Sequence, residues 1–296
     1  MIKPILYTLL TTLTLQSALA NSRLDTIKEN QVIKIGYSDS KFPFTYHSKN
    51  QEPTGFDMAL MEEIAAHLAK SLNLSNLRLE PVLITNSNRF QKIADGEIDL
   101  SCASHSNTIE RKKIVQFSNN YFQTRVRLMV KKDSNIDSYK ALEGKKVAVA
   151  KGTQAETLVQ HKSRQFKFSD VLSTSGRQEN MDLLNRGEVD GIFDDDILLL
   201  GLNALTQQHD DFDFVGPAIS IDNYACILPK DDKEFKELVD RGLAQLFMSD
   251  RIQELYNQWF LQPIQTPDGK EVSLNFEMNS GITSLYRTPN DRAIGE

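Results

Sequence analysis

A four-residue phrase that returns later in the chain constrains the fold more than any other feature. Gly96-Glu97-Ile98-Asp99 is nearly repeated 91 positions later as Gly187-Glu188-Val189-Asp190. A helical pattern ending at the glycine precedes each copy, and an apolar strand pattern overlaps or follows it. Alternating strands and helices are typical of α/β sheets, and this spacing suits a small lobe. We therefore predict an α/β fold with two lobes built on one plan.

Two apolar runs, 126–130 and 224–228, flank the second unit and are expected to carry the chain across and back. The first lobe is then discontinuous, with residues 21–127 plus 225–296, and the second lobe comprises residues 128–224. A ligand cleft is expected between the lobes, because open α/β sheets bind ligands where their strands end. The tail from residue 265 either wraps the first lobe or remains mobile.

The N-terminus predicts export from the cytoplasm. Residues 1–20 combine Lys3, an apolar core and a small-residue end at Ala20, which is typical of a secretory signal peptide. The apolar stretch is too short for a membrane anchor, and no cysteine follows Ala20 to carry a lipid. We therefore expect a periplasmic protein. With 34 basic and 40 acidic residues, nucleic acid is not an expected partner.

The cysteine and histidine content points to a disulfide and to no metal or cofactor. Cys102 and Cys226 are the two cysteines, so export favours a bridge over two buried thiols. The five histidines lack zinc-ligand spacing, and phosphate-loop, dinucleotide and serine-nucleophile motifs are absent from the sequence.

Two helix starts are also predicted, with Asp57 and Asn86 as N-caps.

Polar residues follow three expected strands, where ligand sites of α/β sheets lie. The loop 103–111 ends in Arg111, which can clamp a carboxylate with two hydrogen bonds. Lys151-Gly152-Thr153-Gln154 turns into a helix whose first N–H groups favour an anion. The carboxylates of residues 194–196 suit an ammonium group. The alternatives are that Thr153 and the aspartates only cap helices, and that Arg111 pairs with Glu110.

Several motifs resemble periplasmic amino-acid-binding proteins of ABC importers, the solute-binding protein family 3. They are Phe42-Pro43-Phe44, Gly55-Phe56-Asp57, Gly96-Glu97-Ile98-Asp99, Asn107-Thr108-Ile109-Glu110-Arg111 and Gly144-Lys145-Lys146-Val147. The likeness covers nearly the whole mature chain and is strongest to the glutamate/aspartate-binding members, through 85–89, 224–226 and 289–293. It implies the type II periplasmic-binding-protein fold, the Cys102–Cys226 bridge, a monomer, and an inner-membrane ABC permease as partner.

The resemblance also implies a role for individual residues. Arg111 corresponds to the residue that holds the α-carboxylate of an amino acid, and Asp195 to the one that receives its α-ammonium. Arg89 corresponds to an arginine that faces the ligand side chain. Ser38 stands where the glutamate/aspartate binders have an arginine, and Arg177 where they have a histidine, so nearby Lys41 also enters the charge balance. The implied ligand-binding set is Ser38, Asn86, Arg89, Ser104, Ser106, Arg111, Thr153, Arg177 and Asp195.

The implied function is capture of glutamate or aspartate by closure of the lobes. A receptor for glutamine, asparagine or another polar amino acid is the first alternative. A dehydratase-like enzyme on the same fold is the second, and it needs a general acid, for which His105 and Glu156 are candidates. A separate sensor lobe is the third, and the absence of a fused signalling segment in this sequence argues against it.

Overall fold

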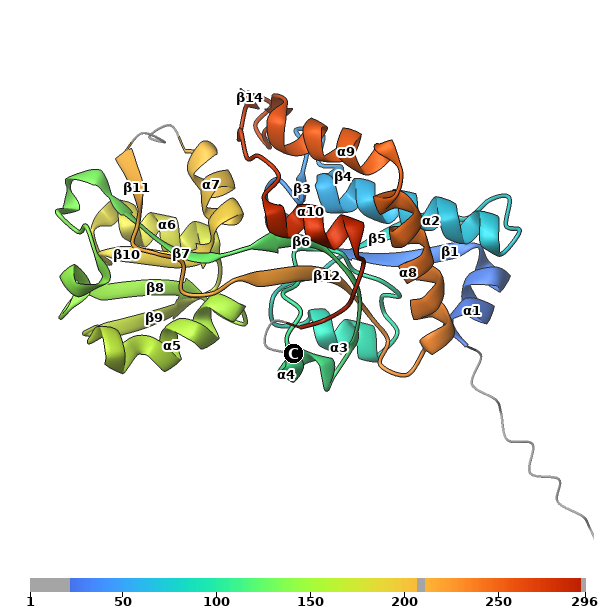
Figure 1. Ribbon diagram of the computed structural model, residues 1–296, viewed down its shortest axis with the longest axis horizontal. Helices are drawn as coiled ribbons and strands as arrows, with labels where there is room; N and C mark the ends of the chain where they lie inside the picture. Colours follow the sequence, from blue (N-terminus) through green and yellow to red (C-terminus); the bar gives the residue numbers. More distant parts are fainter. Residues whose placement is uncertain (1–21, 207–210, 294–296) are drawn as a thin grey trace, which may run out of the picture.

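The computed structural model describes residues 22–206 and 211–293, and the predicted signal peptide lies outside them. Figure 1 shows two lobes that lie side by side along the long axis. The helices are α1 (Arg23–Asn30), α2 (Phe56–Ser71), α3 (Arg89–Ala94), α4 (Ile109–Lys112), α5 (Gln154–Phe166), α6 (Arg177–Arg186), α7 (Asp196–Ala204), α8 (Lys233–Phe247), α9 (Asp250–Tyr256) and α10 (Ser280–Arg287). The strands are β1 (Val32–Tyr37), β2 (Ser40–Lys41), β3 (Thr45–His47), β4 (Pro53–Thr54), β5 (Arg78–Leu83), β6 (Gln116–Thr124), β7 (Val126–Lys131), β8 (Lys146–Ala150), β9 (Asp170–Thr174), β10 (Gly191–Asp195), β11 (Phe212–Val215), β12 (Asp222–Leu228), β13 (Ile264–Gln265) and β14 (Glu271–Val272).

The central sheet of the first lobe is assembled from segments far apart in the sequence. Strands β5 and β1 are parallel, and Ile35 of β1 bridges Leu100 in parallel. Ser101 then bridges Ile227 of β12 in antiparallel fashion, and β12 pairs with β6, again antiparallel. The order is therefore β5, β1, the 100–101 segment, β12 and β6.

The second lobe repeats this order. Its sheet runs β9, β8, β10, β7 and β11, with parallel pairing from β9 to β10 and antiparallel pairing from β10 onward. Gly187 ends α6 with a φ of 70°, and Gly96 follows α3 with a φ of 74°, in the left-handed region that glycine adopts easily. The prediction of two lobes on one α/β plan is confirmed. The residue limits predicted for each lobe stay a prediction.

Two passages join the lobes. Only Arg125 separates β6 of the first lobe from β7 of the second, and β12 returns the chain to the first lobe (Figure 1). The lobes also touch through α7, because a Cβ at Gly201 would lie 2.3 Å from the carbonyl oxygen of Phe42. Ile197 and Leu198 of α7 belong to the apolar core of the first lobe.

The C-terminal segment wraps the first lobe as far as it is described. Helix α10 packs on β6 and buries Ile282, Leu285 and Tyr286. Beyond it, the backbone N–H of Asn120 donates to the Asn290 carbonyl at 2.8 Å. Of the two alternatives for the tail, the wrapped one is observed through residue 293. No helix of residues 22–206 and 211–293 is long and apolar enough to cross a membrane.

Both predicted N-caps are wrong. Helix α2 begins after Gly55, whose φ of 125° only glycine adopts easily, so Asp57 lies inside the first turn and is fully buried. Helix α3 begins after Asn88, and Asn86 lies in the preceding loop. The strand pattern that overlaps Gly96-Glu97-Ile98-Asp99 is observed only as isolated bridges at Leu100 and Ser101.

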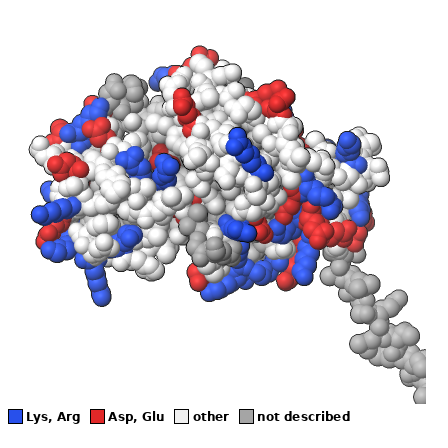
Figure 2. Space-filling model, viewed as in Figure 1, with Lys and Arg blue, Asp and Glu red and all other residues white. Residues whose placement is uncertain are grey.

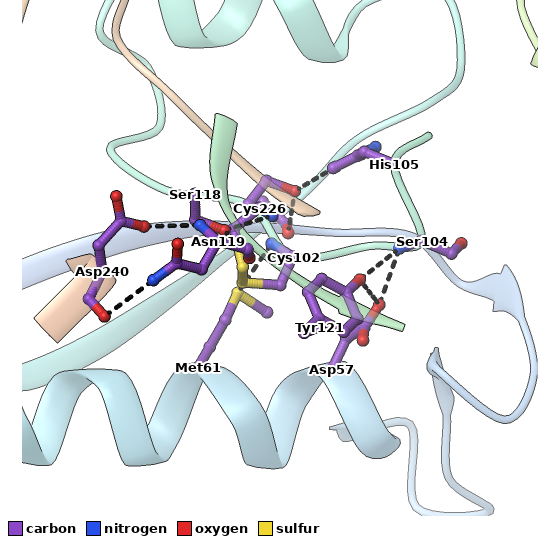
Figure 3. Close-up of a disulfide and its surroundings, with 12 residues drawn as sticks. Asp57, Met61, Cys102, Ser104, His105, Ser118, Asn119, Tyr121, Cys226 and Asp240 are labelled. Atoms are coloured by element: carbon purple, nitrogen blue, oxygen red, sulfur yellow. Dashed lines mark hydrogen bonds between the residues drawn. A yellow bond between two sulfur atoms is a disulfide. The ribbon is translucent and has the colours of Figure 1, made fainter. Parts of the chain in front are cut away.

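The Cys102–Cys226 disulfide is present, as predicted, with both cysteines fully buried. It joins the residue that follows the 100–101 segment to β12, which is the neighbour of that segment in the first sheet (Figure 3). Around it, the Cys102 N–H lies 3.4 Å from Met61 Sδ of α2, and the Cys226 N–H donates to Ser118 Oγ at 2.9 Å. The bridge closes a loop with a sequence separation of 124 residues, which contains the whole second lobe.

Candidate functional site

The loop after Cys102 is shaped by a buried carboxylate. Ser104 has a φ of 48°, which is uncommon outside glycine. Its N–H donates to Asp57 Oδ2 at 2.8 Å and contacts the Tyr121 hydroxyl at 3.1 Å, and that hydroxyl donates to Asp57 Oδ2 at 2.9 Å. Figure 3 shows Asp57 and Tyr121 directed at the Ser104 backbone, with the Ser104 side chain leading away. Ser104 Oγ is buried without a hydrogen-bond partner among the described residues, so it is available to a ligand.

Arg111 ends the same loop on the short helix α4. It does not pair with Glu110, which instead binds Lys113 at 2.6 Å. Its guanidinium donates to the Ser106 carbonyl at 3.0 Å and, across the lobes, to the Gly152 carbonyl at 3.2 Å. Burial lowers the pKa of Arg111, while Asp195 and Asp222 oppose that shift. Arg111 therefore reaches the interface between the lobes in the field of two acids.

Arg89 reaches the same carbonyl from α3. Its Nη2 donates to the Gly152 oxygen at 2.8 Å, and Nη1 donates to the Asn86 carbonyl. The guanidinium carbon lies 4.5 Å from the Phe90 ring centroid, and that of Arg111 lies 5.6 Å from it, so one aromatic ring contacts both cations. Burial and then Arg111 and Arg177 lower the pKa of Arg89 to about 9, which leaves it charged at neutral pH. Its buried Nε has no hydrogen-bond partner among the described residues.

The turn from β8 into α5 supplies the second-lobe side of the cleft. Thr153 is the N-cap of α5, since its hydroxyl accepts from the Glu156 N–H at 3.1 Å and donates to the Ala150 carbonyl at 2.7 Å. The capping alternative for Thr153 is therefore observed. Gly152 has a φ of 75°, and a Cβ there would lie 3.1 Å from the Asn86 carbonyl oxygen. A cavity of about 500 Å³ opens beside this turn, between Thr108–Arg111 and Gly152–Thr157.

Asp195 provides the opposite charge at the end of β10. Its Oδ2 accepts from the Tyr224 hydroxyl at 2.5 Å, and its buried Oδ1 has no hydrogen-bond partner in the described part of the chain. Burial raises the pKa of Asp195 well above its usual range, and the negative charges of Asp194 and Asp222 add to that rise. A ligand ammonium against Oδ1 would both supply the missing donor and stabilise the ionised carboxylate.

The side chains of Arg177 and Ser38, two residues of the implied ligand-binding set, contact other protein side chains. Arg177 is paired with Asp194, whose oxygens lie 2.7 Å from Nε and 3.1 Å from Nη2. Asp194 thus neutralises Arg177 within the second lobe. Ser38 is buried, with its N–H bonded to the Thr45 hydroxyl at 3.2 Å and its Oγ 3.3 Å from Ser40 Oγ. Asn86 contributes its backbone carbonyl rather than its side chain, as does Ser106.

The two candidate general acids also have protein partners. His105 Nε2 lies 2.9 Å from Ser101 Oγ, and Figure 3 shows the ring directed away from Ser104. Burial, with Lys41, Arg89 and Arg111 nearby, lowers the pKa of His105 well below its ordinary value, so the ring is neutral. Glu156 accepts from the Gly152 N–H at 2.7 Å at the start of α5.

The sequence does not predict the buried residues that hold the Ser104 turn and Asp195 in position. Asp57, the expected N-cap, holds the Ser104 turn instead. The hydroxyls of Tyr121 and Tyr224, for which the sequence predicts no role in the site, hydrogen-bond to Asp57 and Asp195. A tyrosine at the start of an apolar run, such as Tyr224, is a usable signal, because a buried phenol needs a partner. No sequence signal separates an aspartate at the cap from one two residues further along the helix.

The surface contrasts with this interior. On the face shown in Figure 2, basic and acidic side chains are interspersed, without one large field of a single sign. The interior near the lobe interface instead collects buried charged groups of both signs, the basic Lys41, Arg89 and Arg177 and the acidic Asp194 and Asp195. Among the residues the structure describes, no group of three or more histidine, cysteine or acidic side chains is placed to hold a metal ion.

Asp57 makes the stability of the folded protein depend on pH. Burial raises its pKa from 3.8 to about 7, against the opposing effects of the Ser104 N–H, Tyr121 and Lys41. The folded state therefore binds the proton more tightly than the unfolded state, and stability falls as pH rises from about 4 through about 7. We expect the free energy of unfolding to drop by roughly 2–3 kcal/mol between about pH 5 and about pH 8 through Asp57.

Denaturant titrations of wild type and Asp57→Asn check this expectation. Asparagine can accept the same two hydrogen bonds without ionising, so its stability profile should be flatter by that amount. Glu62→Gln, at an exposed position of the same helix, is the matched control. Parallel profiles for the wild type and Asp57→Asn would contradict the assignment.

Comparison with known proteins agrees with this fold. The family model described as bacterial extracellular solute-binding proteins, family 3, matches residues 33–262. The glutamate/aspartate import solute-binding protein of Salmonella typhimurium is 32% identical over 276 residues, covering 93% of this chain and 90% of that relative. The L-glutamate/L-aspartate-binding protein of Pseudomonas aeruginosa is 32% identical over 272 residues, covering 91% and 89% respectively.

Solved structures give the same result for the fold. An ancestral arginine-binding protein bound to arginine matches with a TM-score of 0.70 at 26% identity, covering 78% of this chain and 98% of that chain. With the shared strand order of the two lobes, this likeness confirms the type II periplasmic-binding-protein fold. The chain belongs to family 3 of the bacterial extracellular solute-binding proteins.

Proposed function

We propose that this protein is the periplasmic solute-binding component of an ABC importer and that it captures an acidic amino acid, glutamate or aspartate, by closing its lobes. The observation that supports the proposal is that Asp195 of the second lobe lies close enough to Arg111 of the first lobe for its charge to raise the pKa of that arginine. A zwitterionic head needs such a pair of opposite charges. The names of the relatives that import glutamate and aspartate support the choice of ligand.

In this proposal each group has a defined partner. Arg111 binds the α-carboxylate, with Ser104 Oγ as a further donor, and Asp195 Oδ1 accepts from the α-ammonium. The turn at Gly152 and Thr153 closes over the head from the second lobe. Each charge-assisted hydrogen bond contributes roughly 1.5–3 kcal/mol, so a few of them support binding at about 1 μM, or about −8 kcal/mol, after the entropic cost of association.

The proposal assigns no chemical step to the site. The neutral His105 is bonded to Ser101, and Glu156 is bonded at the start of α5, which supports a receptor over a dehydratase-like enzyme. The proposed partner is an inner-membrane permease that recognises the closed, monomeric form.

Calorimetry of the mature protein with glutamate, aspartate, glutamine and asparagine tests this function. We expect saturable binding that is tightest for one of the two acids, a smaller radius of gyration in X-ray scattering on binding, and an unchanged ligand by NMR. Tightest binding of an amide would support the alternative receptor, turnover would support an enzyme, and no binding of any of the four would reject the proposal.

A further inference from the structure

Lys41 is a buried lysine that the assignments above leave without a role. It ends the short strand β2, where it pairs with Thr45 of β3, and it is only 5% exposed. Its Nζ donates to the Ala103 carbonyl at 2.5 Å. Ala103 directly precedes Ser104, so the hairpin places the Lys41 amine beside the loop that carries Ser104 and Arg111.

The amine has no anionic partner in the described protein. It forms no salt bridge with a described carboxylate, and Asp57, the acid that acts on it, uses Oδ2 to hold Ser104 and Tyr121. Burial lowers the pKa of Lys41 well below its ordinary value, and Arg89, Arg177 and Arg111 add to that shift against Asp57. A buried cation among other cations is costly without an anion nearby.

The other cations of the cleft are already matched differently. Asp194 neutralises Arg177 with a two-point contact, and Arg111 lies in the field of Asp195 and Asp222. Ser38, on the same segment as Lys41, carries no charge, and its Oγ lies beside Ser40 Oγ. Lys41 and Arg89 therefore remain, among the residues the structure describes, the buried basic groups of the cleft without a carboxylate partner, so they can match one anion beyond the head group.

We propose that Lys41 is a specificity residue that binds the side-chain carboxylate of the ligand, with Arg89 as its neighbour, and so selects acids over their amides. This inference rests on the proposed function, because it takes the head group to be held by Arg111 and Asp195. An amide can accept a hydrogen bond from the ammonium group through its carbonyl oxygen but leaves the positive charge uncompensated, whereas a carboxylate both accepts the hydrogen bonds and neutralises the charge.

The test is calorimetry of Lys41→Met with glutamate and glutamine, or with aspartate and asparagine if those bind more tightly. Methionine keeps the length and the apolar stem of the side chain but removes the charge. We expect affinity for the acid to fall by about 10- to 100-fold and affinity for the amide to change by less than about 3-fold. Lys41→Arg should retain the preference for the acid.

Several controls keep the outcomes separate. Lys49→Met, at an exposed position beyond the same hairpin, should leave both affinities unchanged. Lys41→Gln, with thermal unfolding, provides a second uncharged variant should Lys41→Met fail to fold. An equal loss for acid and amide, or an unchanged preference in a folded variant, overturns the assignment of Lys41. Failure of the wild type to bind any of the four amino acids instead rejects the proposed function itself.

Discussion

Replacing Arg111 with alanine should weaken amino-acid binding by about 2–5 kcal/mol, or roughly 30- to several-thousand-fold. The large effect is expected because the ligand carboxylate would be buried at the lobe interface without its positive partner. The change also removes the hydrogen bond from Arg111 to the Gly152 carbonyl across the lobes. Calorimetry would therefore show weaker binding of acids and amides alike, since the head group is common to both.

The matched control is Lys113→Ala, which removes an exposed cation one residue beyond α4 that pairs only with Glu110 among the ion pairs of the described residues. It should bind ligand as the wild type does. Arg111→Lys keeps the charge but loses the two-point geometry, so an intermediate affinity is expected. Affinity of Arg111→Ala equal to that of the wild type would refute its assignment to the head group.

Removing the disulfide should produce the largest loss of stability. The Cys102–Cys226 bridge spans a sequence separation of 124 residues. Closing so long a loop lowers the conformational entropy of the unfolded chain and so raises its free energy by about 4–5 kcal/mol. We expect the double variant Cys102→Ala, Cys226→Ala to unfold at a temperature lower by roughly 10 °C or more. Calorimetric unfolding with and without reductant checks this.

The reductant serves as the internal control for that experiment. When the bridge of the wild type is reduced in the unfolded state, the refolded protein should unfold at the same temperature as the double variant. Reductant should not change the unfolding temperature of the variant itself. A double variant as stable as the oxidised wild type would show that native packing around Met61 and Ser118, rather than the covalent link, holds these strands together.

The sequence predicts the architecture of this protein better than the details of its site. The near-repeat at Gly96 and Gly187 predicts two similar lobes because helix stops and strand starts are local signals. The cysteines predict the bridge because the compartment favours it. By contrast, the pairing of Arg177 with Asp194 depends on how α6 packs beside β10, which no local pattern encodes.

The roles of Asp57 and Lys41 also depend on tertiary contacts that the sequence does not predict. A positive φ at Gly55 moves the start of α2 and turns Asp57 from an expected cap into a buried support for Ser104. Lys41 is buried by a two-residue strand, which is too short to leave a periodic pattern. Both residues act through contacts with segments more than forty positions away, so their roles follow only from tertiary structure.

The contact of the Gly152 carbonyl with the opposite lobe affects how the ligand preference of this protein can change in evolution. It receives both Arg89 and Arg111 from the opposite lobe, and as a main-chain atom it is retained whatever side chains line the cleft. Substitutions of cleft side chains other than these two arginines can therefore change the preferred ligand while leaving the contact between the lobes in place. Ligand choice and the fit to the proposed permease can then change separately in evolution.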